Sequence, residues 1–126
     1  EVAGRMHEKK ILVSAFIIPD AEQINAAADA GCDAVELHTG MYANAVATQD
    51  SCDEIKRLKA ARDDSLAREL TVHAGHGLTY RNLAPVAAIE GLCELNIGHS
   101  IIARSVFAGM KQATADMIAL IDKYSR

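Results

Sequence analysis

The sequence predicts an α/β protein in which four strand–helix units form a parallel sheet with its helices outside. Two observations support this prediction. Short apolar runs alternate with stretches of helical periodicity along the whole chain, and the connections between them are short, as expected for repeated βα units. The 126 residues, half of them apolar, are enough for one domain with a hydrophobic core.

The first unit begins with a strand over residues 11–18, whose nearly continuous apolar run is typical of a strand buried on both faces. Asp20 and Gln23 then form a capping box, which predicts a helix that stops at Gly31. Residues 1–10 carry a charged helical pattern without an initial methionine, and we expect them to be the remnant of a preceding helix.

The second unit has a strand over residues 34–38, a loop through Gly40 and Tyr42, and a helix from about Ser51. Ser51 and Glu54 make a second capping box at the start of this helix. The apolar face of the helix is supplied by Ile55, Leu58, Leu66 and Leu70.

The third unit has a strand over residues 70–74, a glycine-bearing loop over 75–77 and a short helix over 83–89. The fourth has a strand over 93–97, a helical turn over 101–106 and an amphipathic helix over 110–124. The chain has no GxGxxG after its first strand and no GxxxxGK[ST], so the usual nucleotide-binding motifs are absent from the sequence.

Composition excludes several classes of protein. Thirteen basic and seventeen acidic residues give a net charge of −4, which argues against a nucleic-acid binder. Three cysteines without a CxxC spacing favour neither a disulfide framework nor structural zinc, so we expect a cytoplasmic protein. No apolar run approaches the roughly 20 residues of a membrane span, and we expect no membrane partner.

Polar residues and glycines gather where the predicted strands end. Glu36 and His38 end the second strand, His73 and His76 lie at the end of the third, and Gly98 with His99 follows the fourth. Because ligands of α/β folds bind at the carboxyl ends of the strands, these positions are the candidate site.

Two glycine-containing turns are candidates for binding an anion. Gly77 and Gly98 each stand just before a predicted helix, where free N–H groups and the positive helix end attract phosphate. The alternative is that both glycines only permit tight turns with positive φ.

His76 and Glu36 are the candidates for proton transfer. An imidazole titrates near neutrality, which suits a general acid or base, whereas a loop histidine can also make a purely structural hydrogen bond. A carboxylate inside an apolar strand costs several kcal/mol unless it is paired or functional, and the alternative is a buried pair with Lys or Arg. His38 and His73 add potential metal ligands, but the HxxH spacing across a turn is weak, and we expect no metal.

Four segments resemble the pyridoxine 5′-phosphate synthase family in order and spacing. They are VSAFI at 13–17, VELHTG at 35–40, HAGHGLTY at 73–80 and ELNIGHSIIAR at 94–104. The resemblance runs from about residue 11 to the end of the chain. Two positions depart from the family pattern: His73 stands where asparagine is usual, and Ala15 replaces a commoner leucine.

The resemblance implies a TIM (β/α)8 barrel, of which these four βα units would form the C-terminal half as one region over residues 1–126. The family condenses 1-deoxy-D-xylulose 5-phosphate with 3-amino-2-oxopropyl phosphate to pyridoxine 5′-phosphate, phosphate and water. It needs no organic cofactor or metal, and it forms homo-oligomers. The length is about half of the roughly 250 residues of such a barrel, so we expect the chain alone to be incomplete and poorly active.

The resemblance also assigns roles to residues already singled out. His76 would be the proton donor, Glu36 a carboxylate of the active site, and the backbone at Gly77, Gly98 and His99 would hold a substrate phosphate. The alternatives are a non-catalytic phosphate-binding or assembly module and a metal-dependent hydrolase.

Overall fold

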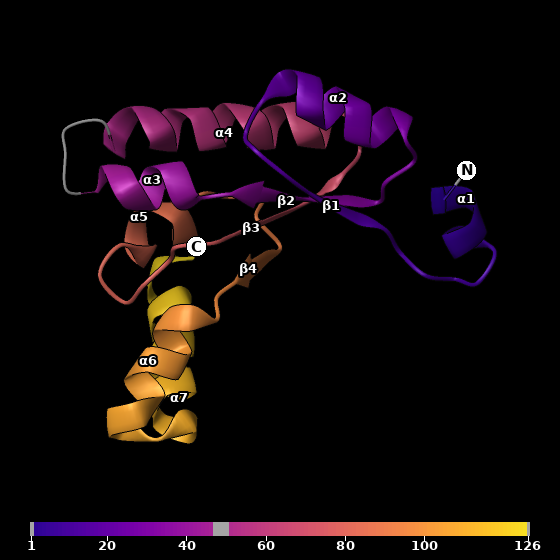
Figure 1. The fold of residues 1–126 in the computed structure, drawn as a ribbon. Coiled ribbons are helices and arrows are strands. Elements are labelled where there is room, and N and C mark those ends of the chain that lie inside the picture. Colours follow the sequence, from indigo (N-terminus) through magenta and orange to yellow (C-terminus); the bar gives the residue numbers. More distant parts are fainter. Residues whose placement is uncertain (1, 47–50, 126) are drawn as a thin grey trace.

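The computed structural model describes residues 2–46 and 51–125 and has a four-stranded parallel sheet at its centre. Its strands lie side by side in the order in which they occur in the chain (Figure 1). They are β1 (Ser14–Ile17), β2 (Ala34–His38), β3 (Thr71–Gly75) and β4 (Glu94–Asn96). The predicted α/β class with alternating strands and helices is therefore confirmed.

The helices are α1 (Val2–His7), α2 (Ala21–Asp29), α3 (Gly40–Ala45), α4 (Ser51–Ala67), α5 (Leu83–Ala87), α6 (His99–Ala108) and α7 (Met110–Tyr124). Helices α2 and α4 run side by side over the sheet, whereas α6 and α7 pair with each other and extend away from it (Figure 1). Within the described part of the chain, no helix has the length and apolar character to cross a membrane.

Helix α2 confirms the capping box expected at its start. The side chain of Asp20 accepts hydrogen bonds from the N–H groups of Glu22 and Gln23, and Gly31 follows the helix with a φ of 81°. Helix α4 begins at Ser51, and the residue before it lies outside the described part, so the second capping box is not tested.

Three local predictions were wrong. The segment from Gly40 to Ala45 is helix α3 and not a loop, because the buried Tyr42 anchors it to the core. The first strand is shorter than predicted and starts at Ser14. Leu66, expected on the apolar face of α4, is 45% exposed because it lies beside and not within the buried stripe of this helix, which is formed by Leu58, Ala61 and Ser65.

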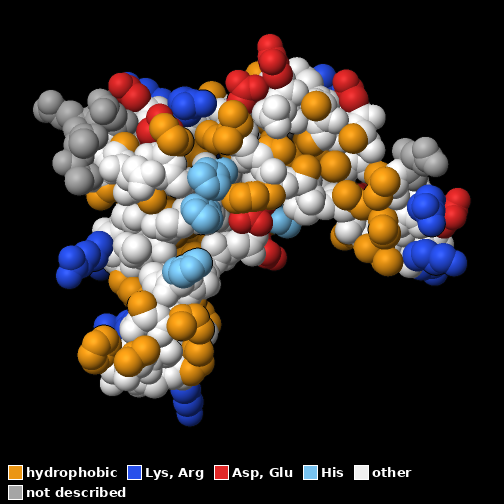
Figure 2. Space-filling model, viewed as in Figure 1, with side chains coloured by type: hydrophobic (Ala, Val, Ile, Leu, Met, Phe, Trp, Pro, Cys, Tyr) orange, Lys and Arg blue, Asp and Glu red, His pale blue; other side chains and the backbone are white. Residues whose placement is uncertain are grey.

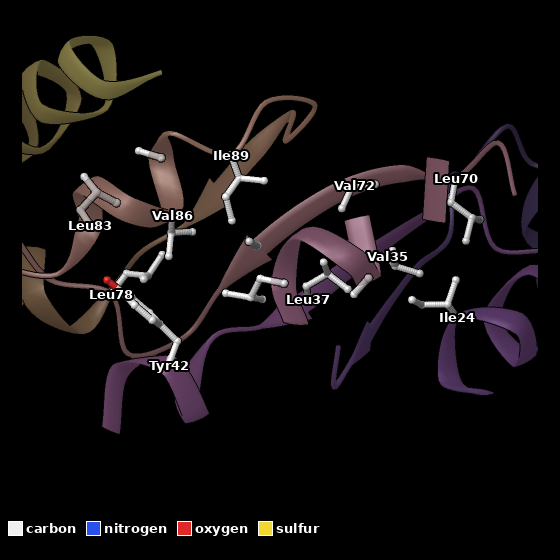
Figure 3. Close-up of a cluster of buried hydrophobic side chains, with 14 of the residues drawn as sticks. Ile24, Val35, Leu37, Tyr42, Leu70, Val72, Leu78, Leu83, Val86 and Ile89 are labelled. Carbon is white, nitrogen blue, oxygen red and sulfur yellow. The ribbon is translucent and has the colours of Figure 1, made fainter. Parts of the chain in front are cut away.

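One face of the sheet carries the core. Val35, Leu37, Val72 and Ala74 alternate along β2 and β3 and are at most 1% exposed. They pack against buried side chains of the helices and their connections, among which Figure 3 labels Ile24, Leu78, Leu83, Val86 and Ile89. Leu58 of α4 belongs to the same cluster. This packing provides most of the hydrophobic stabilisation, because these side chains are almost completely removed from water.

The opposite face of the sheet is polar and open. Phe16, Glu36, His73 and Glu94 are register neighbours across the four strands, and Phe16 is 57% exposed. The prediction that the first strand is buried on both faces was therefore wrong. Parallel sheets are normally covered on both faces, but here the described residues cover only one.

Asp33 joins the starts of β1 and β2. Its carboxylate accepts hydrogen bonds from the backbone N–H of Val13, at 2.7 Å, and from the His7 imidazole, at 2.8 Å. These two donors hold the pKa of the Asp33 carboxyl below its ordinary value. Asp33 thus links helix α1 and the beginning of β1 to the sheet.

The two faces of the sheet predict unequal costs of truncation. Leu37→Ala on the covered face is expected to lower the free energy of unfolding by about 2–5 kcal/mol, because it leaves a cavity. Phe16→Ala on the open face is expected to cost less than about 1 kcal/mol, because that ring is already largely hydrated. Urea unfolding of both variants measures the difference, and equal costs would mean that another layer covers Phe16 in solution.

Asp33 predicts a pH dependence of stability. Its folded-state pKa is lowered, so it stabilises the fold above its ordinary pKa, and this contribution is lost as the pH falls through the folded value. As the pH falls from about 5 toward about 2, the native chain should therefore lose stability more steeply than Asp33→Asn. Asp122→Asn, which alters an exposed carboxylate on α7, is the control and should follow the native curve. A gap between native and Asp33→Asn that stays constant with pH would contradict this role.

Candidate active site

A pocket of about 540 Å³ lies where β2, β3 and β4 end and α6 begins. It is lined by Glu36, His76, Gly77, Leu78, Thr79, Asn96, Ile97, Gly98, His99, Ser100 and Ala103. Histidine side chains gather in the same region, between the sheet and the α6–α7 pair (Figure 2). All five site residues predicted from the sequence therefore line one pocket: Glu36, His76, Gly77, Gly98 and His99.

Glu36 points from β2 toward the end of β4. Its Oε2 accepts a hydrogen bond of 2.8 Å from the Asn96 amide. The carboxylate lies so close to Gly75 that a Cβ on that residue would overlap Oε1, so the approach requires glycine there. Among the described residues no Lys or Arg forms an ion pair with Glu36, and the side chain lies on the open face and not in the apolar core. The alternative of a buried ion pair was therefore wrong.

Gly98 is the N-cap of α6 and presents bare backbone to the pocket. It has no side chain to cap the first N–H groups of the helix, and its φ of −122° does not require glycine. A Cβ built on Gly98 would meet nothing within 4 Å. The tight-turn explanation therefore fails at this position, whereas open space beside uncapped N–H groups is suited to an anion.

Unlike Gly98, Gly77 occupies a position where the backbone conformation and the packing both require glycine. Its φ is 76°, and a Cβ there would lie 2.7 Å from the Cβ of Ala43. Turn geometry and close packing therefore explain this glycine without a ligand. The prediction that Gly77 stands directly before a helix was wrong, because α5 begins only at Leu83.

Ser100 connects the two glycine-containing turns. From the first turn of α6, its hydroxyl donates a hydrogen bond of 2.8 Å to the carbonyl oxygen of Leu78. The start of α6 is therefore held against the segment that carries His76 and Gly77. The uncapped helix end and His76 both line the one pocket.

His76 is exposed and stacks against a second imidazole. The ring centroids of His76 and His38 are 4.6 Å apart, and that of Phe16 lies 5.2 Å from His38. His38 contacts the His76 ring but is not among the residues that line the pocket. His73 lies on the open face of β3, outside the same lining. In the part of the chain that the structure describes, no three His, Cys, Asp or Glu side chains gather as metal ligands would.

Sequence reasoning missed a set of polar residues that hold the site together. Asn82 accepts hydrogen bonds from the N–H and the hydroxyl of Thr79 and donates one of 3.1 Å to the carbonyl of Gly77. The Tyr42 hydroxyl in turn donates to the Asn82 carbonyl at 2.7 Å, and burial raises the pKa of this phenol. Thr39 and Asn96 belong to the same set. Thr79 and Asn82 are turn-favouring residues three positions apart, and this spacing is the sequence signal that could have indicated their local hydrogen bonds.

The fold and the pocket define a class of protein: a βα-repeat protein with a pocket at the carboxyl ends of its parallel strands, where ligands of α/β folds bind. Comparison with known families then identifies the member. The model of the family described as "Pyridoxal phosphate biosynthesis protein PdxJ" matches residues 1–123, and the chain belongs to this family.

Curated relatives agree with this assignment. The chain is 47% identical over 121 residues to the pyridoxine 5′-phosphate synthase of Magnetococcus marinus, covering 96% of this chain and 50% of the relative. It is 50% identical over 111 residues to the enzyme of the same name from Legionella pneumophila, covering 88% and 45%. The chain thus spans about half the length of these relatives.

Replacing each of the two pocket glycines with alanine is expected to change stability by different amounts. Gly77→Ala is expected to cost about 1–2 kcal/mol or more, because alanine is strained at positive φ and would collide with Ala43. Gly98→Ala is expected to stay within about 1 kcal/mol of the native chain, because nothing opposes its methyl group. Urea unfolding distinguishes them, and a large loss of stability for Gly98→Ala would restore the tight-turn explanation.

Proposed function

We propose that this chain is the C-terminal half of a TIM (β/α)8 barrel over residues 1–126. The open face of the sheet supports this, because Phe16, Glu36 and His73 would face the interior of a closed barrel. The unpaired outer edges of β1 and β4 are where the remaining strands would join. The relatives, about twice as long as the chain, provide the length that such a barrel needs.

We infer that the complete barrel is a pyridoxine 5′-phosphate synthase. It would condense 1-deoxy-D-xylulose 5-phosphate with 3-amino-2-oxopropyl phosphate to pyridoxine 5′-phosphate, with release of phosphate and water. The observation that carries this proposal is one pocket lined by both an exposed histidine and an uncapped helix end. Both substrates are anionic, and the condensation requires several proton transfers.

His76 and Glu36 supply the groups for those proton transfers. Imine formation, enolisation and elimination each need a proton donated or accepted near neutral pH, which an imidazole does well. His76 is accessible from the pocket, and its ring is backed by His38. Glu36, oriented by the Asn96 amide, places a carboxylate in the same pocket, where it stabilises positive charge that develops on an imine nitrogen.

The substrate phosphate is held by backbone groups. The first N–H groups of α6 have no side-chain cap, Gly98 and His99 line the pocket, and the open space at Gly98 lets a phosphate approach these groups. Gly77 adds exposed backbone on the other side. Holding the anion there keeps the reacting atoms near His76 through successive intermediates.

The proposed function also indicates the binding partners, the cellular location and the oligomeric state of the complete protein. The partners are phosphorylated small molecules, and the place of action is the cytoplasm, where reduced Cys32, Cys52 and Cys93 are stable. The complete protein is a homo-oligomer, as the family resemblance implies. By itself the chain is expected to have little turnover, because the rest of the barrel contributes the other wall of the site.

A hybrid enzyme tests this function. The chain replaces the matching half of the Legionella pneumophila relative, and formation of pyridoxine 5′-phosphate is measured. His76→Ala is expected to lower kcat by about 10²–10⁴-fold, the usual contribution of a general acid or base. The matched control is His73→Ala, which lies on β3 just before the turn that carries His76 and outside the pocket lining, and it should stay within a few-fold of the unmodified hybrid.

Each outcome of the hybrid assay has a definite meaning. Near-native turnover of His76→Ala would overturn the catalytic role of that residue. A folded hybrid that binds inorganic phosphate but forms no product would favour the non-catalytic binding module. Metal-dependent release of inorganic phosphate from either substrate, without formation of pyridoxine 5′-phosphate, would favour the metal-dependent hydrolase.

A further inference from the structure

His76 has a backbone conformation that its own residue type does not favour. Its φ is 82°, in the left-handed region that L-residues with a Cβ rarely adopt, and Gly77 after it has a φ of 76°. A non-glycine residue stays in this region only when its surroundings hold it there. The position of the imidazole therefore depends on whatever fixes the turn over residues 75–77.

Thr39, at the end of β2, contacts this turn with two donors. It is completely buried, and its backbone N–H donates a hydrogen bond of 2.7 Å to the carbonyl oxygen of Gly75. Its hydroxyl oxygen lies 2.7 Å from the same carbonyl and 2.5 Å from the carbonyl oxygen of His76. A hydroxyl group has one proton to donate.

Counting donors and acceptors assigns that proton. The Gly75 carbonyl already accepts the N–H of Thr39, whereas among residues 2–46 and 51–125 the hydroxyl of Thr39 is the group that donates to the carbonyl of His76. If the hydroxyl donates to the His76 carbonyl, both carbonyl groups have a donor. If it donates to the Gly75 carbonyl, the His76 carbonyl has no donor among these residues. Thr39 therefore holds the strained residue itself through its carbonyl.

The residues next to Thr39 pack against the same turn. The His38 ring stacks on the His76 ring at 4.6 Å, and a Cβ on Gly40 would overlap the His38 ring, so glycine is needed to admit it. One turn later, Ala43 contacts the position of Gly77. The end of β2 and the start of α3 thus form a continuous support beneath the turn that carries the imidazole.

We propose that Thr39 is a positioning residue for His76: its hydroxyl holds the His76 carbonyl and thereby keeps the imidazole stacked on His38 and turned toward the pocket. The proposal deepens the proposed function, because it concerns the residue that would transfer protons. Its structural part concerns the chain alone and does not depend on turnover.

NMR of the 126-residue chain tests the structural part directly. Thr39→Val removes the hydroxyl with little change in shape, and Thr39→Ser restores it. Ser65→Ala is the matched control, because Ser65 is equally buried and its hydroxyl donates to the Ala61 carbonyl within α4, away from the pocket. Circular dichroism and urea unfolding establish that each variant is folded.

The readout is the position of the His76 ring. In Thr39→Val, the His76 Cε1–H resonance should move from its native position, and its nuclear Overhauser contact to the His38 ring should weaken. In Thr39→Ser and Ser65→Ala, both signals should stay native. A merely structural Thr39 would lower stability as Ser65→Ala does and leave the His76 signals unchanged, and that result in folded Thr39→Val would overturn the proposal.

If Thr39→Val does not fold, Thr39→Ser carries the test. It keeps the hydroxyl and loses only the methyl group, so a displaced His76 resonance would overturn the proposal and a native one would support it.

Kinetics of the hybrid enzyme then connect the position to turnover. Thr39→Val is expected to lower kcat about tenfold or more with KM changed less than about threefold, because the phosphate is held mainly at α6. Equal loss in Ser65→Ala, or unchanged kcat in Thr39→Val, would overturn the functional part. An inactive unmodified hybrid would count against the proposed function. The NMR experiment would still test the positioning of His76 by Thr39, because it does not depend on turnover.

Discussion

The packing of Val35, Leu37, Val72 and Ala74 beneath the helices is the interaction on which the rest of the structure depends. Side chains alternate along a strand, so burying these residues on one face turns their neighbours to the other. Glu36 and His73 therefore reach the same open face, and they do so at adjacent register positions. Burial of the core residues on one face therefore explains why Glu36 and His73 lie together on the other face.

The parallel arrangement of the strands has a second consequence. All four strands end at the same edge of the sheet, so the segments that follow them meet there even though they are far apart in the chain. The pocket at this edge combines the carboxylate from β2, the imidazole from the turn after β3 and the helix end after β4. Hydrogen bonds from Ser100 to Leu78 and from Thr39 to the β3 turn hold these three contributions together.

Gly75, beside the pocket, and Gly77 and Gly98, which line it, are glycines for three different physical reasons. Gly75 admits the carboxylate of Glu36, Gly77 permits a positive φ against Ala43, and Gly98 meets no neighbour within the chain. Only the last is left without an explanation from packing or backbone strain, which makes it the strongest argument for a bound anion. The sequence alone cannot separate these cases, because all three residues are glycine and differ only in their tertiary surroundings.

The sequence by itself determined the α/β class, the number and approximate limits of the strands, the cap at Asp20 and the final helix, because these depend on local periodicity and local hydrogen bonds. It also selected Glu36, His76, Gly77, Gly98 and His99, because polar residues at strand ends are visible in the order of the chain. Only the tertiary structure decided that the first strand is open on one face, that residues 40–45 are helical and that Thr39, Asn82 and Asn96 support the site. The physical reason is that burial, stacking and the assignment of hydrogen-bond donors depend on contacts between distant segments. Such contacts leave no period or motif in the sequence.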